Sequence, residues 1–347
     1  MAVDRELKAG IEQGLRFAML ATPDGHYLDL SWKEVAEWKP ADGFLWVHLE
    51  RNDPTAAAWV TDRSGIDPLV AMALLAEESR PRVEDVDDDL LVVLRGVNKC
   101  RPEDGKIDTE LVPIHIWMQA NRCITLRDKD HNLNALRDLR LSMMNGKGPR
   151  TAGALMARIA EKVTDHLGDL VEEMEEEISS LEDRIANNDS GPGMRVEIAA
   201  TRRRVVQFRR YLGPQRDALY RLLHDDATWL TMDAKKHLGE VNDRLVRHLE
   251  DLDEIRQRAT ILQEEQAAMI AEQGNRNTLA LSIVSVIMLP MTFITGYFGM
   301  NTGALPFGAE HPFGTWIATA IICAVGALTA FILRYGIKGP GGSRRDR

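Results

Sequence analysis

The first 150 residues alternate short apolar runs with polar turns. Runs rich in β-branched and aromatic residues predict strands, and two such runs around a short polar turn predict a hairpin. Residues 68–78 carry a helical pattern. We therefore predict an α+β (α/β) domain over residues 1–150. Its predicted strands cover 43–49 and 90–97, and its predicted hairpin covers 111–118 and 123–127.

From residue 151 the apolar positions recur every three or four residues, which is typical of amphipathic helices. Turn-forming residues at 187–193 interrupt this pattern, so we predict an antiparallel helix pair over 151–232. A third helix is predicted over 233–298, since Pro290 is its first proline. Some sixty helical residues would extend about 90 Å, more than one small domain can bury. We therefore expect the helix to pack against partners, most simply further copies of the chain.

Two uncharged apolar segments, 279–298 and 315–333, lie near the end of the chain. Each is long enough to cross a hydrocarbon core of about 30 Å. The alternative of two buried core helices fits less well, because such helices seldom lack charge over this length. We predict two membrane spans joined by a loop over 299–314 and followed by a basic tail over 334–347. Because the loop has no Lys or Arg, both termini are expected in the cytoplasm and the loop outside.

Composition excludes several classes of function. The chain has 347 residues and a net charge of −10, which argues against a nucleic-acid surface. Its three cysteines occur singly, so no thiolate metal cluster is indicated. The sequence contains no recognisable nucleophile–base pair, phosphate-binding loop or cofactor motif, so we expect neither an enzyme nor a bound cofactor.

A polar stripe runs along the predicted first span. Polar groups on a membrane helix face other helices or water. The stripe is therefore either a helix-packing face or the wall of a pore made by symmetric copies of the helix. Its residues are three or four apart and fall within an arc of about 100° on a helix. They are Asn275, Thr278, Ser282, Ser285, Leu289 and Thr292.

The end of the first span carries a resemblance to a known family. A large soluble domain, a long helix entering the membrane, the segment 297–301 (Tyr-Phe-Gly-Met-Asn), a second span and a basic tail resemble the CorA family of divalent-cation transporters. Within that family the chain is most similar to the ZntB zinc-transporter branch. The segments 78–82 and 94–98 carry this similarity, as does the loop 301–306, which lacks the acidic stretch of the magnesium channels.

The resemblance implies a funnel-shaped homopentamer in the inner membrane of a bacterium, with five first-span helices around a central path. It also implies zinc uptake, with protons as coupling ions and Cd²⁺, Ni²⁺, Co²⁺ and Mg²⁺ as further candidate ions. A magnesium or cobalt channel of the same family is one alternative. A membrane-anchored signalling or scaffold protein is the alternative from another class, and the polar stripe argues against it because a passive anchor needs none.

The resemblance further implies that Gly299, Met300 and Asn301 shape the outer entrance. A ring of Asn301 amide oxygens would hydrogen-bond the water around a divalent ion without trapping the ion. Gly299 would let the backbone turn close to the axis. For Asn301 the alternative is a helix C-cap without a role in transport.

Three ionisable residues are further candidates for contact with metal ions. Glu310 and His311 lie in the predicted outer loop, where Glu310 would concentrate cations and His311 would bind zinc or sense pH. The alternative is that both are ordinary exposed loop residues. Glu264 would ring the inner end of the path. The acidic run 172–177 is either a solvated helix face or a surface that attracts cations. The sequence shows no set of ligands with the close spacing of a structural zinc site.

Overall fold

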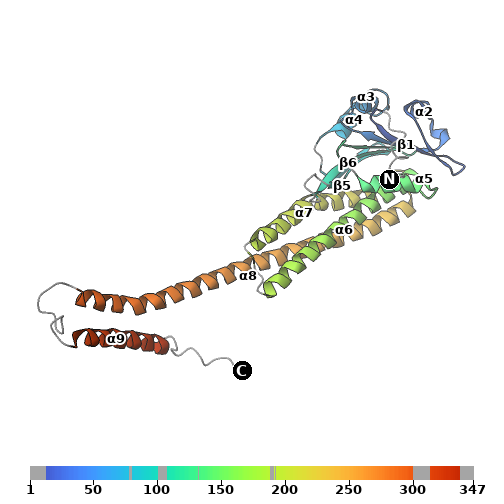
Figure 1. Cartoon of the computed structure of the whole chain (residues 1–347). Helices are drawn as coiled ribbons and strands as arrows, with labels where there is room; N and C mark the ends of the chain where they lie inside the picture. Colours follow the sequence, from blue (N-terminus) through green and yellow to red (C-terminus); the bar gives the residue numbers. More distant parts are fainter. Residues whose placement is uncertain are drawn as a thin grey trace, which may run out of the picture. The chain divides into compact units, whose positions relative to one another are not determined.

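The structure is a computed structural model in which the chain forms two compact units, Met1–Gln263 and Glu264–Arg347. The first unit contains a mixed β-sheet with helices and a helical bundle, and the second contains the end of one long helix and one further helix (Figure 1). The structure describes residues 13–77, 80–100, 108–131, 133–187, 191, 193–299 and 313–336.

Seven strands form one mixed sheet in the order β2-β1-β3-β7-β6-β5-β4. Neighbouring strands are antiparallel except β3 and β7, which are parallel. The central strand β3 is an almost continuous buried apolar run, as expected for a strand covered on both faces. The strands predicted at 43–49 and 90–97 and the predicted hairpin are confirmed. The strands are β1 (Leu15–Ala21), β2 (Tyr27–Asp29), β3 (Phe44–Glu50), β4 (Arg82–Val86), β5 (Asp89–Cys100), β6 (Asp108–Met118) and β7 (Arg122–Arg127).

Three helices and one short 3-10 helix follow the first strands, and the helices pack onto the apolar core of the sheet (Figure 1). Each of the three helices begins after a residue whose side chain accepts a backbone N–H of the first turn, namely Ser31, Asp53 and Asp67. The elements are α2 (Trp32–Glu37), η1 (Pro40–Asp42), α3 (Pro54–Asp62) and α4 (Pro68–Leu75).

The helix predicted over 68–78 is shorter than expected. It ends at Leu75 because Ala76 takes an extended backbone with φ −62° and ψ 141°. An extended residue cannot continue the helical hydrogen-bond pattern, so the chain leaves the helix here on its way to β4.

Long helices complete the first unit. The predicted apolar seam of the helix Ala152–Ala186 is buried, including Leu155, Ile159 and Val163. Ion pairs fasten the bundle from outside, with Arg244 Nη1 2.9 Å from Asp165 Oδ1 and a forked pair between Arg258 and Glu182. The helices are α5 (Asn134–Met144), α6 (Ala152–Ala186), α7 (Met194–His224) and the start of α8 (Met232–Phe298).

The helix α8 runs without interruption over 67 residues, with Pro290 inside it. This confirms the prediction that the polar helix continues into the apolar segment. Within the second unit α8 is followed by α9 (Gly314–Gly336). The two helices approach closely where Gly326 has no side chain, since a Cβ there would lie 3.3 Å from Sδ of Met291.

Candidate functional site

The polar stripe lies on an uncovered face of α8. At about 100° per residue, the stripe and the partly buried residues of the same segment fall on opposite sides of the helix. Contact between Met291 and Gly326 shows that the partly buried side faces α9. The exposed stripe residues are Asn275, Thr278, Ser282, Ser285, Leu289 and Thr292. The partly buried residues are Ile283, Ile287, Pro290, Met291 and Ile294.

Three stripe hydroxyls donate to the backbone carbonyl four residues earlier. Thr278 Oγ1 donates to Gly274 O at 2.9 Å, and Ser285 Oγ donates to Leu281 O at 2.9 Å. Thr292 Oγ1 makes the same bond to Met288 O at 2.8 Å. A hydroxyl that has donated its proton can only accept further hydrogen bonds. The stripe therefore presents acceptor oxygens, which suit the outward-pointing hydrogens of water bound to a cation.

Leu289 is the apolar member of the stripe, and the residue is 74% exposed. It lies between Ser285 and Thr292 along the same face. Copies of this helix around an axis would bring several leucine side chains together at one level. Such a ring would form an apolar constriction between two levels of hydroxyl groups.

The end of α8 is described as far as Gly299. Its N–H donates to Thr295 O at 2.9 Å, so the helical hydrogen-bond pattern reaches this residue. Met300, Asn301, Glu310 and His311 lie outside the described residues, and their predicted roles stay predictions.

Glu264 lies on the same side of α8 as the stripe. It is exposed and precedes Ser282 by 18 residues, which is about five helical turns. Nearer the apolar segment, Glu272 pairs with Arg276, with 2.5 Å between Oε1 and Nη2. Among the described residues, Glu264 forms no salt bridge, and its role toward a cation stays a prediction.

The second unit contains apolar helices without a covering protein core. The apolar part of α8 is long and apolar enough to cross a membrane, and none of that stretch is buried. The apolar stretch in α9 is shorter, Trp316–Ile332. Among the residues that the structure describes, no group of three or more His, Cys, Asp or Glu side chains is placed to hold a metal ion.

The acidic run 172–177 is partly paired. Arg204 on α7 contacts Glu177 through Nη1 at 2.5 Å and Glu173 through Nη2 at 3.8 Å. Glu172 and Glu176 are exposed. Two members of the run thus join α6 to α7, which favours the interpretation as a solvated helix face over that of a cation-attracting surface.

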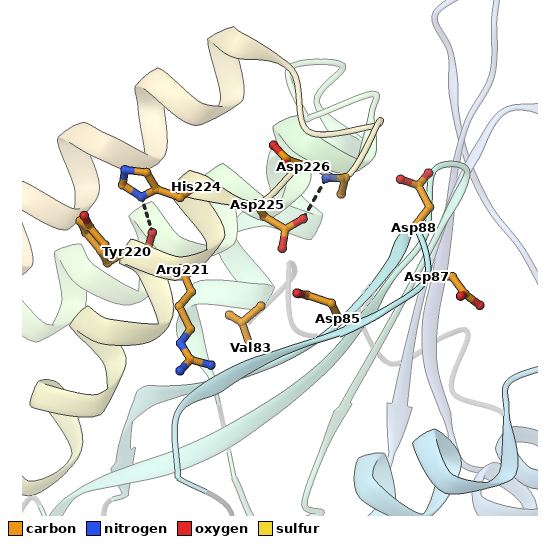
Figure 2. Close-up of a pocket in the computed structure, with 10 residues that line it drawn as sticks. Val83, Asp85, Asp87, Asp88, Tyr220, Arg221, His224, Asp225 and Asp226 are labelled. Carbon is orange, nitrogen blue, oxygen red and sulfur yellow. Dashed lines mark hydrogen bonds between the residues drawn. The ribbon is translucent and has the colours of Figure 1, made fainter.

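The structure reveals an acidic cavity that the sequence interpretation missed. It has a volume of about 550 Å³ and lies between the β4–β5 hairpin and the turn after α7 (Figure 2). Burial raises the pKa of the Asp225 carboxyl, and the nearby Asp85 adds to this against a hydrogen bond from Ala227 N–H. The acidic residues of the β4–β5 hairpin can be seen in the sequence. Nothing in the sequence, however, predicts that they lie beside the turn after α7, which is 140 residues further along the chain.

Several polar groups at this cavity form hydrogen bonds that stabilise the fold. Asp88 accepts the Thr228 N–H at 2.8 Å and the Thr228 hydroxyl at 2.5 Å. The carbonyl of Asp88 accepts the Trp229 indole N–H at 2.8 Å. These bonds fasten the turn that leads from α7 into α8 and so position the start of the long helix.

Comparison with known proteins identifies the class. The family described as "CorA-like Mg2+ transporter protein" matches residues 41–335. The chain therefore belongs to the CorA family of divalent-cation transporters. The chain is 33% identical in sequence to the "Divalent cation transporter CmaX" of Pseudomonas aeruginosa, and the alignment covers 94% of this chain and 97% of that protein. The solved structure of full-length CmaX protein superposes with a TM-score of 0.79 at 32% identity, over 94% of this chain and 99% of that chain.

Two further relatives bear on the specific branch and on the fold. The "Zinc transport protein ZntB" of Pectobacterium carotovorum subsp. carotovorum is 32% identical over 83% of this chain and 86% of that protein. The complete structure of the CorA magnesium transporter from Methanocaldococcus jannaschii is 20% identical, with a TM-score of 0.77 over 93% of this chain and 98% of that chain. At 20% identity, the similarity to the Methanocaldococcus jannaschii structure shows the fold alone. The predicted family and fold class are confirmed.

Proposed function

We propose that the chain is one subunit of a homopentamer that carries zinc into the bacterial cell along a central path lined by the polar stripe of α8. The observation that carries the proposal is the placement of the stripe on the face of α8 opposite α9. A row of hydroxyl groups is better placed against other helices or water than against lipid, even where each proton is bonded within its own helix. Copies of α8 around an axis would remove the stripe from lipid and enclose it.

The topology of the proposal follows the pattern of charge. The apolar part of α8 and the helix α9 both cross the inner membrane, with the loop 299–314 outside and both termini in the cytoplasm. The first unit and the basic tail 334–347 then lie on the cytoplasmic side. The number five comes from the family resemblance, and the need for copies comes from the exposed stripe.

The proposed mechanism passes the ion with its water. Gly299, Met300 and Asn301 form the outer entrance, where amide oxygens accept hydrogen bonds from the ion's hydration shell. The hydroxyl oxygens of Thr292, Ser285, Ser282 and Thr278 then accept these hydrogens in turn, and Leu289 forms the constriction between them. A ring of Glu264 carboxylates attracts the cation at the inner end of the path. Glu310 would raise the cation concentration at the mouth, and His311 would add a group that binds zinc or a proton.

Zinc is the proposed substrate because the similarity to ZntB proteins covers most of the chain. A magnesium or cobalt channel is the second candidate, supported by the description of the family. Flux into proteoliposomes, measured separately for Zn²⁺, Mg²⁺ and Co²⁺ with and without an inward proton gradient, tests the choice. We expect Zn²⁺ flux that increases with the gradient. Mg²⁺ flux without Zn²⁺ flux would support the second candidate.

The substitution Asn301→Ala tests the entrance. We expect it to abolish metal flux while the purified protein keeps its oligomeric mass, because the proposed role of the amide is to act on the passing ion. Asn52→Ala is the matched control, since Asn52 is an exposed asparagine of the first unit. Undiminished flux through the Asn301→Ala protein would contradict the proposed entrance. Absence of flux from the unaltered protein for every ion would instead favour the scaffold function.

A further inference from the structure

A second cavity, unrelated to the stripe, lies between α2 and α3 in the first unit. Its volume is about 690 Å³, which is within the usual range of small-molecule sites. Three of its lining side chains are tryptophans, Trp32, Trp38 and Trp59. Two of the others are arginines, Arg63 and Arg122. The proposed transport function uses none of these residues.

The indole rings are held in place by the protein. Trp32 Nε1 donates to Gln13 O at 2.9 Å, and Trp38 Nε1 donates to Gly43 O at 3.3 Å. The rings of Trp32 and Trp59 lie 5.3 Å apart at 50° to each other. Because the N–H groups of Trp32 and Trp38 are already bonded, these two rings offer the cavity apolar surface rather than a donor. Such a surface favours a flat aromatic ring in offset or edge contact.

The two guanidinium groups that line the cavity are not bonded directly to a carboxylate, although Asp89 lies near enough to act on the charge of Arg122. Nε and Nη2 of Arg122 both donate to Gln119 Oε1, a neutral amide oxygen, at 2.8 and 2.6 Å. Burial lowers the pKa of the Arg122 guanidinium, and the charge of the nearby Asp89 carboxylate opposes this shift. Within the described part of the chain, neither Arg122 nor Arg63 forms a salt bridge. A partly desolvated guanidinium whose donors meet a neutral amide rather than a carboxylate favours binding of an anion.

The charges of the residues that line this cavity also argue against a divalent cation as its ligand. Among the described residues that line this cavity, Asp62 is the one carboxylate, beside two arginines. The lining residues together carry one more positive than negative charge, which disfavours a free divalent cation there. A ligand that suits both the aromatic wall and the cationic rim combines a planar ring with negative charge.

We propose that the cavity between α2 and α3 binds a planar aromatic anion, with the ring against Trp32, Trp38 and Trp59 and the anionic group at Arg63 and Arg122. Nucleotides and aromatic carboxylates share this chemistry. A nucleotide's phosphates offer several oxygens, enough to meet both guanidinium groups, whereas one carboxylate would meet one of them bidentately.

Isothermal titration calorimetry on the full-length protein in detergent, with EDTA present to remove divalent ions, tests the proposal. The probes are ATP, indole-3-carboxylate, adenosine as a ring without charge, and tripolyphosphate as charge without a ring. We expect ATP or indole-3-carboxylate to bind roughly tenfold more tightly than adenosine or tripolyphosphate. The tighter of the two aromatic anions shows whether the site suits a nucleotide or an aromatic carboxylate. Equal affinity for tripolyphosphate, or no binding of either aromatic anion, would overturn the proposal.

Variants separate this cavity from other binding surfaces. Arg63→Gln is chosen because Arg63 is exposed, so the fold should survive its loss. We expect roughly tenfold weaker binding in this variant and a similar loss in Trp38→Leu. Arg203→Gln is the matched control on α7, where the guanidinium is also exposed. Unchanged affinity in both cavity variants, or an equal loss in the control, would place the ligand elsewhere. Metal flux plays no part in this readout, so failure of the proposed transport function would leave the result interpretable.

Discussion

The side chain of Met291 on α8 lies directly over Gly326 on α9, where a Cβ would be only 3.3 Å from the methionine sulfur. This contact marks the face of α8 that the second helix covers. The polar stripe lies on the other face. The same contact therefore sets the direction in which the stripe points, and it leads to the first prediction.

Gly326→Leu is expected to push α9 away from α8. Overpacking at a close helix contact costs about 1–3 kcal/mol. The expected result is a lower melting temperature in detergent together with reduced metal flux. Ala327→Leu is the control, because Ala327 is exposed on the neighbouring face of α9. Equal losses in the two variants would show that the Met291–Gly326 contact has no special importance.

Leu289→Ser is expected to increase metal flux. A hydroxyl in place of the exposed leucine would remove the apolar constriction and let water fill that level of the path. We expect a rise by a factor of about two or more in proteoliposome flux, with unchanged oligomeric mass. The control is Leu279→Ser, since Leu279 is also an exposed leucine of α8, 52% accessible, but lies off the stripe. A similar rise in both variants would contradict the constriction.

The substitution His115→Gln is expected to reduce the amount of stability that the folded protein loses as the pH falls. His115 is fully buried, and burial lowers its pKa from 6.5 to about 4, with Arg51 adding to the effect. The unfolded chain therefore binds a proton below pH 6.5 that the folded protein does not take up until about pH 4. Stability falls across this window as the pH falls, by about 3 kcal/mol for this group.

Melting temperatures of the full-length protein between pH 7 and pH 4 would measure this dependence. The slope should flatten in His115→Gln and stay unchanged in His26→Gln, whose side chain is 76% exposed. The buried His48, whose pKa is also lowered by burial, would keep part of the slope in the variant. A slope that is unaltered by His115→Gln would rule out His115 as its source.

Asp88→Ala is expected to loosen the turn between α7 and α8. The hydrogen bonds from the Thr228 side chain and backbone lower the pKa of the Asp88 carboxyl, so they favour the charged form. Their stabilising effect is present above the ordinary pKa and is lost as the pH falls through the lowered one. We expect a lower melting temperature at neutral pH, with a difference from the unaltered protein that narrows in acid. Asp226→Ala provides the comparison, as an exposed neighbour in the same turn.

Several features of this protein follow from its sequence alone. Helical spacing predicted the buried seam of α6, and the absence of proline between residue 233 and Pro290 predicted that α8 runs on into its apolar segment. The residues of the polar stripe share one side of α8 because helix geometry alone puts them there. The strands at 43–49 and 90–97 were equally visible. These features depend on residues that are close in the chain, so local periodicity reveals them.

Tertiary structure decided which surfaces meet. Only the packing of α9 shows that the stripe is left uncovered, because a helical pattern does not say which of its faces a neighbour will take. The parallel pairing of β3 with β7, the acidic cavity beside Asp225 and the tryptophan cavity between α2 and α3 likewise join segments distant in the sequence. Such contacts depend on the summed burial of many apolar side chains over the whole fold, and no single segment carries that information.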